Sequence, residues 1–570
     1  MGDQDGSLKK KRMVIIGLSS MILVAMVVAV AVGANYKKVG GSAEGDISSD
    51  AAPIRSSTKA VAEICQPTDY KEACFDSLSS AAKKNTTDPK ELVKLAFNVT
   101  VEKVRKALSQ SKVLQEAEKD PKTKTALENC EELMDYAIDD LENSLKKFED
   151  FDLSQADELV NDIKIWISGS ITYQETCLDG FDGTQSEAAE KLKKTIVAAS
   201  QLSSNALAII DQISAVLDSL DLSFLNRKLL STDGGYPSWV SATARRLLQA
   251  GAGGVVPDAV VAKDGSGKYN TITAALAQVP KKSKKPFVIR IKAGVYNEMV
   301  MVEKHMWNVI MIGDGPTKTK ITGNKNYIDG TPTFKTATVA VVGAGFIAKD
   351  IGFENSAGAA KHQAVALRVQ SDQSVFYRCQ MDGYQDTLYT HTHRQFYREC
   401  TITGTIDFIF GNAAVVFQDC KILARKPMAN QQNIVTAQGR KDRREPTAII
   451  LHNCKISADP TLFPVRKQFK TYLGRPWKMY SRTFIFQSEI DDLIQPEGWL
   501  PWLGDFALNT CFYSEFDNRG DGAPMGKRAT WRGIKKMTPE RATKFTVQNF
   551  IHGNKWIRAA GVPFTPLLLA

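Results

Sequence analysis

The sequence has little of what several common catalytic and binding classes require. It contains six histidines in 570 residues and no Gly-x-Ser-x-Gly elbow, which argues against a serine-esterase triad. Zinc-finger spacing, the aromatic signature of RNA-binding modules and a basic helix with heptads are also missing. His391 and His393 have no Cys or acidic partner at a suitable spacing. We therefore expect exposed turn histidines there, and neither a metal nor a cofactor.

Length and charge divide the chain into unlike halves. A chain of 570 residues with 43% apolar residues exceeds one ordinary core. Residues 251–570 carry 43 Lys and Arg against 26 Asp and Glu, a net charge of +17, so the total of +10 leaves −7 for residues 1–250. A basic half attracts a polyanion, and a tethered acidic half can cover the same surface. Without nucleic-acid motifs, an acidic polysaccharide fits this charge equally well.

An uncharged stretch near the start predicts entry into the secretory pathway. Residues 13–33 follow a basic segment at residues 1–12 and are long enough to cross a bilayer as a helix. A convincing small-x-small cleavage site is missing, so a signal anchor with a cytoplasmic basic segment is favoured over a cleaved signal. We expect a membrane-anchored precursor.

Nine cysteines in a secretory context predict disulfide bonds. Five of them lie in the basic half, and this odd number leaves at least one thiol unpaired there. Two Asn-x-Thr sequons in the acidic half, at Asn85 and Asn98, are candidate glycosylation sites. The four cysteines of the acidic half are Cys65, Cys74, Cys130 and Cys177.

Residues 60–222 have helical periodicity. Apolar residues recur at three-and-four spacing and would bury one helix face. Short polar turns such as Thr87-Asp88-Pro89 separate these segments, which indicates an antiparallel all-α four-helix bundle. One such stripe comprises Leu127, Cys130, Met134, Ala137, Leu141, Leu145 and Phe148.

Residues 223–250 form a linker rich in Gly, Ser and Pro. It contains two basic pairs, Arg227-Lys228 and Arg245-Arg246, each followed by Leu-Leu. Proteolysis concentrates in exposed linkers, so we interpret both pairs as processing sites. The alternative is a solvated charge cluster.

From Val260 onward the sequence changes to short β-rich runs. The motif Phe-Tyr-Arg-Cys ends at Cys379, and similar motifs end at Cys400 and Cys420, 21 and 20 residues further on. A repeat near 20 residues built from strands predicts a parallel β-helix. The Leu/Asn framework of leucine-rich repeats is missing. The runs are Phe287–Ile291, Val309–Ile312, Thr338–Val342, Val375–Tyr377, Val415–Phe417, Ala448–Leu451 and Thr483–Phe486.

The phase of this repeat predicts a carboxylate pair. Asp386 lies seven residues after Cys379, and Asp407 lies seven residues after Cys400, so stacking places the two aspartates at equivalent positions of neighbouring coils, about 4.8 Å apart. Such a pair holds one proton near neutrality, which supplies an acid and a nucleophile. Aspartates that bond backbone amides at coil turns are the alternative. The same phase brings adjacent cysteines within disulfide reach.

Three segments resemble the signatures of plant pectin methylesterases: Gly383–Tyr389, Asp407–Asn412 and Leu473–Trp477. The resemblance covers residues 255–557 and implies a right-handed parallel β-helix. Upstream, the four cysteines of the helical region are similar to those of the invertase/pectin methylesterase inhibitor domain. The whole chain therefore resembles a pectin methylesterase precursor with an inhibitor-like pro region, secreted to the cell wall after cleavage by a subtilisin-like protease.

The resemblance also implies roles for individual residues. Asp407 would attack the methyl-ester carbonyl, and Asp386 would protonate the departing methanol and then activate water. Gln385 would stabilise the transition state. The residues implied to bind substrate are Thr333, Gln363, Arg475 and Trp477, and the implied disulfide cysteines include Cys400 and Cys420 besides the four upstream.

Two of these residues allow alternative interpretations. The guanidinium of Arg475 suits either a galacturonate carboxylate or Asp407, and Trp477 suits either a sugar ring or the core. For the whole chain, a polysaccharide glycosidase or lyase is the enzymatic alternative, because carboxylates about 5 Å apart also suit a retaining glycosidase. An inhibitor protein with an inert β-helix is the other. The expected partners are pectin, a processing protease and a separate inhibitor protein, for a protein that is otherwise a monomer.

Overall fold

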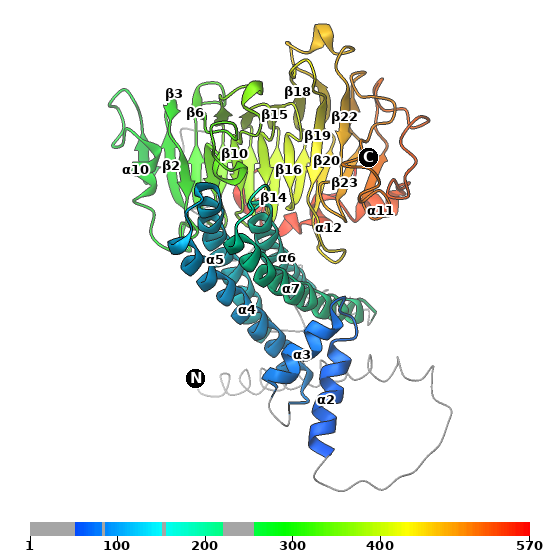
Figure 1. Ribbon diagram of the computed structural model, residues 1–570. Coiled ribbons are helices and arrows are strands. Elements are labelled where there is room, and N and C mark those ends of the chain that lie inside the picture. The colour runs from blue at the N-terminus through cyan, green and yellow to red at the C-terminus, as the bar shows by residue number, and fades with distance from the viewer. Residues whose placement is uncertain (1–51, 83–85, 151–155, 220–255, 570) are drawn as a thin grey trace, which may run out of the picture. The chain divides into compact units, whose positions relative to one another are not determined.

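A computed structural model describes residues 52–82, 86–150, 156–219 and 256–569, which divide into a helical unit and a β-helical unit (Figure 1). The predicted membrane segment 13–33, the sequon at Asn85 and both dibasic pairs lie outside the described residues. Within the described ranges, no helix is both long and apolar enough to cross a membrane.

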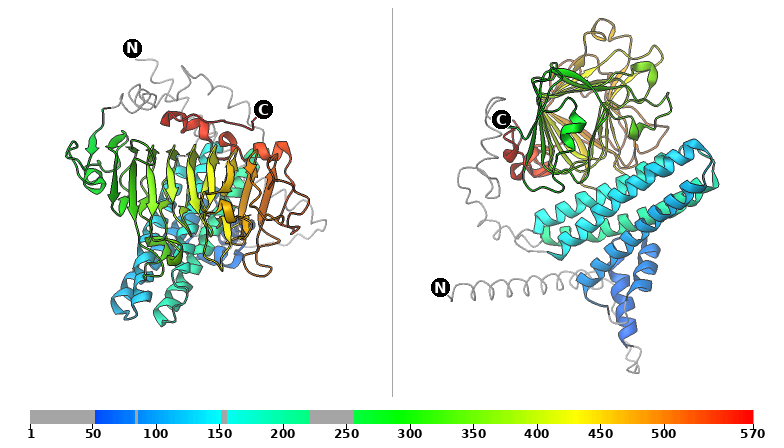
Figure 2. Two further views of the ribbon diagram at one scale, coloured as in Figure 1. Left: turned by 90° about the horizontal axis from the view of Figure 1, so that it is seen from above. Right: turned by 90° about the vertical axis from the view of Figure 1, so that its left-hand side faces the viewer.

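Four long helices form the body of the helical unit. Helices α4 and α6 each pack against both α5 and α7, which is the neighbour pattern of a four-helix bundle (Figure 2, right). Two shorter helices precede them and pack against α4. The helices are α2 Ala52–Ile64, α3 Lys71–Ala81, α4 Pro89–Ala117, α5 Pro121–Glu149, α6 Ala156–Asp179 and α7 Glu187–Ser219.

The starts of α4 and α5 follow from an Asp-Pro pair at each. Asp88 accepts a hydrogen bond from the backbone of Lys90, and Asp120 accepts one from Thr123. Each cap satisfies one of the orphan amides of the first turn, and the following proline is pre-set for the first helical position. The apolar stripe predicted along α5 is buried except at Leu145, which is half-buried.

Two disulfides staple the helical unit. Cys65 at the end of α2 pairs with Cys74 in α3, and Cys130 in α5 pairs with Cys177 in α6. The prediction for these four cysteines is therefore confirmed. The second bond joins neighbouring bundle helices across 47 residues of chain.

The β-helical unit consists of three sheets of parallel strands, each strand belonging to one coil (Figures 1 and 2). This confirms the predicted β-helix. In sheet order, the ten-stranded sheet contains β1 Ala259–Val261, β2 Phe287–Ile291, β5 Val309–Ile312, β8 Ile347–Lys349, β11 Ser374–Tyr377, β14 Arg394–Arg398, β17 Ala414–Gln418, β20 Ala448–His452, β23 Arg482–Phe486 and β25 Phe512–Phe516.

The other two sheets complete each coil. The eight-stranded sheet contains β3 Gly294–Asn297, β6 Thr319–Gly323, β9 Gly352–Asn355, β12 Gln380–Asp382, β15 Thr401–Gly404, β18 Lys421–Ala424, β21 Lys455–Ala458 and β24 Glu489–Ile490. The seven-stranded sheet contains β4 Val300–Val302, β7 Val339–Val341, β10 Leu367–Val369, β13 Leu388–Thr390, β16 Ile409–Gly411, β19 Asn433–Gln438 and β22 Thr471–Gly474.

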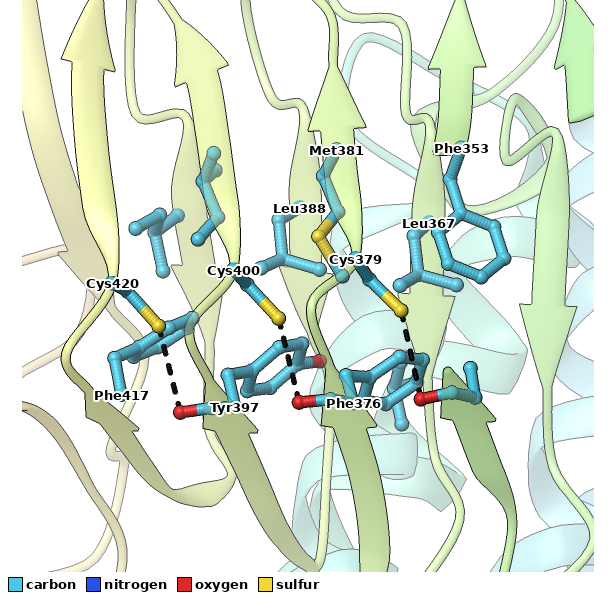
Figure 3. Close-up of a cluster of buried hydrophobic side chains, with 14 of the residues drawn as sticks. Phe353, Leu367, Phe376, Cys379, Met381, Leu388, Tyr397, Cys400, Phe417 and Cys420 are labelled. Carbon is cyan, nitrogen blue, oxygen red and sulfur yellow. Dashed lines mark hydrogen bonds between the residues drawn. The ribbon is translucent and has the colours of Figure 1, made fainter. Parts of the chain in front are cut away.

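Equivalent positions of successive coils stack in the core (Figure 3). The rings of Phe376 and Tyr397 lie 4.7 Å apart, and those of Tyr397 and Phe417 lie 4.6 Å apart. All three are fully buried, and stacked aromatic pairs add stability beyond the area they bury. One repeat of 20 or 21 residues in the sequence therefore corresponds to one coil of the β-helix.

The predicted bond between Cys400 and Cys420 is wrong. Both cysteines are free thiols, because residues at equivalent coil positions point in the same direction rather than toward each other (Figure 3). Each thiol instead donates to a backbone carbonyl of the preceding coil, at 3.4 Å from Cys400 to Phe376 and 3.5 Å from Cys420 to Tyr397. Cys454 extends this row by one coil, with a bond to Phe417.

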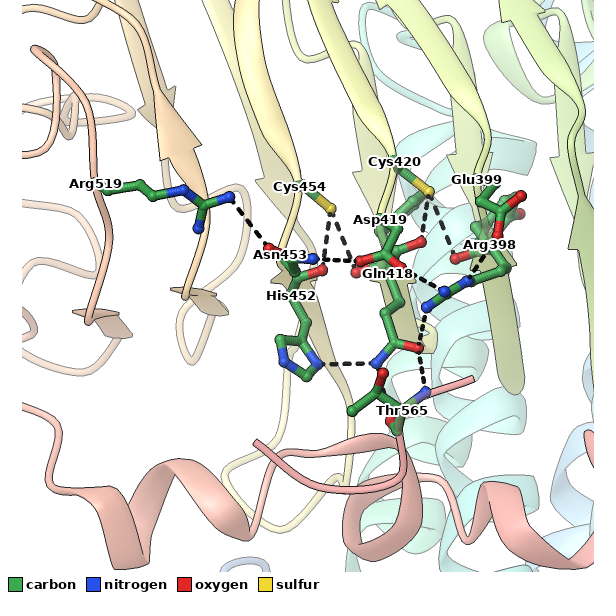
Figure 4. Close-up of polar contacts among 12 residues, drawn as sticks. Arg398, Glu399, Gln418, Asp419, Cys420, His452, Asn453, Cys454, Arg519 and Thr565 are labelled. Atoms are coloured by element: carbon green, nitrogen blue, oxygen red, sulfur yellow. Dashed lines mark hydrogen bonds and ion pairs between the residues drawn. The ribbon is translucent and has the colours of Figure 1, made fainter. Parts of the chain in front are cut away.

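The C-terminal segment lies along the ten-stranded sheet. The side-chain amide of Gln418 exchanges two hydrogen bonds with the backbone of Thr565, at 2.8 and 2.9 Å (Figure 4), and Gln487 does the same with Leu569. His452 lies between the two glutamines and contacts both. The short helices of the unit are α10 Ile272–Leu276, η2 Thr333–Lys335, η3 Ala359–Lys361, η4 Phe463–Val465, α11 Pro539–Thr543, α12 Val547–Phe550, η5 Gly553–Lys555 and η6 Arg558–Ala560.

Candidate active site

Asp386 and Asp407 lie in consecutive coils, at the turns that precede β13 and β16. The two strands pair Leu388 with Ile409, an offset of 21 residues, and the same offset separates the aspartates. The N–H of Asp386 donates to the carbonyl of Ile406 at 3.0 Å, which ties one turn to the next. Both aspartates have positive φ, +62° and +49°, a conformation that Asp adopts more readily than most residues. Register therefore stacks the two carboxylates.

Burial and charge separate the proton affinities of the pair. Asp386 is 8% exposed and Asp407 is 6% exposed. Burial raises the pKa of Asp386 well above its usual range, the neighbouring Asp407 raises it further, and Arg475 opposes both. Burial also raises the pKa of Asp407, but the hydrogen bonds and charge of Arg475 counteract the rise. A single proton on the pair is therefore held by Asp386, while Asp407 stays ionised.

Arg475 follows β22 and forms a bidentate pair with Asp407. Its Nε donates to Oδ1 at 2.9 Å, and its Nη2 donates to Oδ2. Of the two functions considered for this guanidinium, the structure therefore shows the contact with Asp407. The planar fork matches both carboxylate oxygens and leaves the ionised form of Asp407 favoured.

Gln385 and Gln363 lie at turns of adjacent coils. The N–H of Ala364 donates to the carbonyl of Gln385 at 3.2 Å. The side-chain Oε1 of Gln385 is buried and has no hydrogen-bond partner among the described residues. Both side chains are half-buried.

Thr333 lies in the coil before that of Gln363, whereas Trp477 packs beside the strands β13 and β16 that follow the two aspartates. Thr333 begins η2, and the hydroxyl of Thr336 in the same turn accepts from the N–H of Val365 at 3.0 Å, which links that turn to the coil of Gln363. Trp477 is half-buried, and its ring meets the edge of Phe410 at 5.9 Å. The alternative of a fully buried core tryptophan is therefore wrong.

The expectation of exposed turn histidines is also wrong. His391 is fully buried and His393 is 6% exposed. The ring of His391 packs against Tyr389 at 4.4 Å, and the Nδ1 of His393 lies 2.6 Å from the carbonyl oxygen of Gln370. Both follow β13 directly. Within the described ranges no group of His, Cys, Asp and Glu has the arrangement of a metal site.

The structure adds two aromatic residues that sequence reasoning did not single out. The ring of Trp502 lies 4.2 Å from the guanidinium carbon of Arg475, and the ring of Tyr384 lies 4.0 Å from that of Arg425. Tyr384 belongs to the motif Gly383–Tyr389 that the sequence analysis identified, but the sequence did not indicate its contact with Arg425. Trp502 lies 27 residues after Arg475 on an irregular segment, and no periodicity connects the two.

Comparison with known proteins agrees with this geometry. Residues 258–554 match the pectinesterase family model, and residues 59–209 match the model for plant invertase/pectin methylesterase inhibitors. The probable pectinesterase/pectinesterase inhibitor 21 of Arabidopsis thaliana is 51% identical over 100% of this chain and 84% of its own length. The pectinesterase/pectinesterase inhibitor U1 of Solanum lycopersicum is 44% identical over 98% of this chain and 97% of its own length.

One solved structure of high identity covers the β-helical unit. Pectin methylesterase from carrot is 55% identical, covers 55% of this chain and 99% of its own chain, and superposes with a TM-score of 0.55. With two family models that together span both units, the chain belongs to the pectinesterase family, with an inhibitor-type helical domain ahead of its esterase domain.

Proposed function

We propose that the β-helical unit removes methyl esters from pectin with Asp407 as nucleophile and Asp386 as general acid and then base. The observation that carries this assignment is the unequal pair: Asp407 is clamped by Arg475, whereas burial and the neighbouring charge raise the pKa of Asp386. An ionised and a protonated carboxyl group in stacked coils are what a two-step ester hydrolysis requires.

In the first step, a carboxylate oxygen of Asp407 attacks the ester carbonyl carbon, and the carbonyl electron pair moves to its oxygen. The side-chain amides of Gln385 and Gln363 donate to this oxyanion. The tetrahedral intermediate collapses, the bond to the methoxy oxygen breaks, and Asp386 gives that oxygen its proton. Methanol leaves, and an acyl-enzyme remains on Asp407.

In the second step, Asp386 acts as a base. It takes a proton from a water molecule whose oxygen attacks the acyl carbon, and Asp407 departs as a carboxylate. Asp386 is protonated again and the galacturonate carboxyl is released. Trp477, beside β13 and β16, and Thr333, in the coil before that of Gln363, are assigned to sugar units of the bound pectin.

A methanol assay tests this function against the glycosidase alternative. Residues 249–570 are incubated with methylated pectin, and methanol and new reducing ends are measured together. We expect methanol without reducing ends. Reducing ends without methanol would reject the esterase assignment, and the carboxylate pair would then belong to glycosidic chemistry.

For the helical unit we propose autoinhibition or folding assistance, supported by its inhibitor-type family match and its opposite charge. The chain would enter the secretory pathway through residues 13–33, carry glycans on Asn85 and Asn98, and reach the cell wall after cleavage by a subtilisin-like protease at Arg227-Lys228 or Arg245-Arg246. Asn98 is exposed on α4, as a modified residue must be. Equal activity of the uncleaved chain and residues 249–570 would remove the inhibitory role.

A separate inhibitor protein remains a proposed partner of the processed enzyme. Glycan mapping and the N-terminal sequence of the mature enzyme test the glycosylation and cleavage proposals. The basic β-helical half would bind anionic wall polymers in a salt-sensitive way, because screening acts over about 8 Å at physiological ionic strength.

A further inference from the structure

Trp502 lies on an irregular segment that is fastened next to Arg475. The N–H of Leu500 donates to the carbonyl of Gly474 at 3.0 Å, directly before Arg475 in the chain. Ten residues later, the hydroxyl of Thr510 donates to the carbonyl of Met479. Both ends of the segment 500–510 are therefore attached to the strand end and turn that carry Arg475.

The guanidinium of Arg475 is held on two sides. Its Nε and Nη2 edge binds Asp407, and its plane covers the ring of Trp502, with 4.2 Å between the guanidinium carbon and the ring centroid. Tryptophan is the best ring for such a cation–π contact. Trp502 is itself half-buried, so the contact is partly removed from water, where it is stronger than at an exposed site.

We propose that Trp502 is a positioning residue for the esterase reaction, which fixes the plane of the Arg475 guanidinium so that Asp407 stays ionised as the nucleophile. This inference rests on the proposed roles of Asp407 and Asp386. Trp502 acts through Arg475 and does not touch the reacting atoms.

The physical need for such a support comes from burial. Asp407 is 6% exposed, and its burial raises the pKa against the effect of Arg475. An arginine side chain has many rotamers, and each rotamer that leaves the bidentate geometry leaves a buried carboxylate unpaired. A flat ring against the guanidinium removes such rotamers and keeps both hydrogen bonds in place.

The rival function for Trp502 is a platform for a sugar ring. One face of the indole already contacts Arg475, so a sugar can use only the other face. Loss of a platform raises KM and leaves the pH profile unchanged. Loss of a positioning residue raises the pKa of Asp407 and moves the acid limb of the kcat profile.

The test compares Trp502→Leu and Trp502→Phe in the processed enzyme, with Leu503→Ala as the matched control. Leu503 is the next residue and is 77% exposed. Methanol release is measured from pH 4 to pH 8 at several pectin concentrations. We expect the acid limb of kcat to move up by about half a unit to one unit in Trp502→Leu, the shift that a three- to tenfold change in proton affinity produces. Trp502→Phe returns the acid limb most of the way to its original position, and Leu503→Ala leaves the profile unchanged.

An acid limb that stays in place in a folded Trp502→Leu enzyme overturns the inference, and a rise in KM alone assigns Trp502 to the sugar. A fall in kcat at every pH without rescue by phenylalanine also overturns it, because that is the result of general structural damage. Asp407→Asn is measured in parallel. If it keeps full activity, the proposed nucleophile is wrong; if it is inactive and the Trp502 limb is unmoved, only the positioning role fails.

Discussion

The helical unit and the β-helical unit both bury their cysteines, but only the helical unit bonds them. In the bundle, Cys130 and Cys177 approach from two different helices and meet face to face. In the solenoid, Cys379, Cys400, Cys420 and Cys454 occupy equivalent places in successive coils and bond backbone carbonyls instead. Proximity along a repeat is therefore insufficient for a disulfide, which also requires side chains that point toward each other.

The same stacking has the opposite consequence for the aspartates. Two thiols that point in the same direction form no disulfide. Two stacked carboxylates do interact, because the Coulomb interaction between charges extends over several ångströms and needs no particular side-chain direction. The solenoid thus converts a sequence spacing into an electrostatic pair. The bundle has no such repeat, and its buried positions are set by helix faces.

The largest effect is expected from removing the carboxylate of Asp407, which the β-helical unit places next to Asp386. Asp407→Asn keeps the shape of the side chain but removes the nucleophile, so methanol release by the processed enzyme falls on the order of 10⁴-fold or more. Thermal unfolding of the helical unit, measured on the uncleaved chain, is unchanged. Substantial activity in a folded Asp407→Asn enzyme would contradict the assignment.

The second prediction concerns the disulfide between Cys130 and Cys177 of the helical unit. Cys130→Ala opens a bond that closes 47 residues of chain, and it is expected to lower the unfolding free energy of the bundle by about 3 kcal/mol. Urea unfolding monitored by far-ultraviolet circular dichroism measures the change. A matched Thr125→Ala variant in the same helix, at a half-buried position whose hydroxyl bonds only the carbonyl of Pro121, should change little. Equal loss in both variants would show that the disulfide is not responsible.

The third prediction concerns His452, a buried histidine of the β-helical unit. The described residues of the helical unit contain no histidine. Burial lowers the pKa of His452 to about 4, below its ordinary value near 6.5. The unfolded chain therefore binds more protons between these values, so the β-helical unit loses roughly 2–3 kcal/mol of stability as pH falls from about 6.5 to about 4. Urea midpoints at pH 7 and pH 4.5 measure this loss.

His452→Gln is the control for that measurement. A glutamine can still bond Gln418 and Gln487 but does not titrate, so the pH dependence should become smaller by about that amount. An unchanged pH dependence in His452→Gln would mean that other groups cause the acid sensitivity.

The smallest effect is expected from replacing a cysteine by alanine in the β-helical unit. Cys400→Ala removes one sulfur and its weak hydrogen bonds to the carbonyls of Phe376 and Arg398, which costs about 1 kcal/mol because no cross-link is lost. Unfolding of the isolated β-helical unit measures it. Labelling the denatured, unreduced protein should find five free thiols, and three would indicate a bond within the row.

Much of this architecture was predictable because it is periodic. The stripe from Leu127 to Phe148 predicted a helix with one buried face, and the motif spacing from Cys379 to Cys420 predicted both the solenoid and the adjacency of Asp386 and Asp407. His391 and His393 were misjudged because a polar pair among threonines, without a Cys or acidic partner at a suitable spacing, suggested an exposed turn, whereas the fold buries both.

Local patterns in the sequence by themselves determined where the helices begin, the length of a coil and the phase of the aspartate pair, since these depend only on neighbouring residues and a repeat. Only the tertiary structure decided that the stacked thiols stay unbonded, that Arg475 binds Asp407 and that Trp502 covers its guanidinium. These facts depend on the directions of side chains and on contacts between segments that the sequence repeat does not relate to each other. A periodic pattern in the sequence therefore cannot predict them.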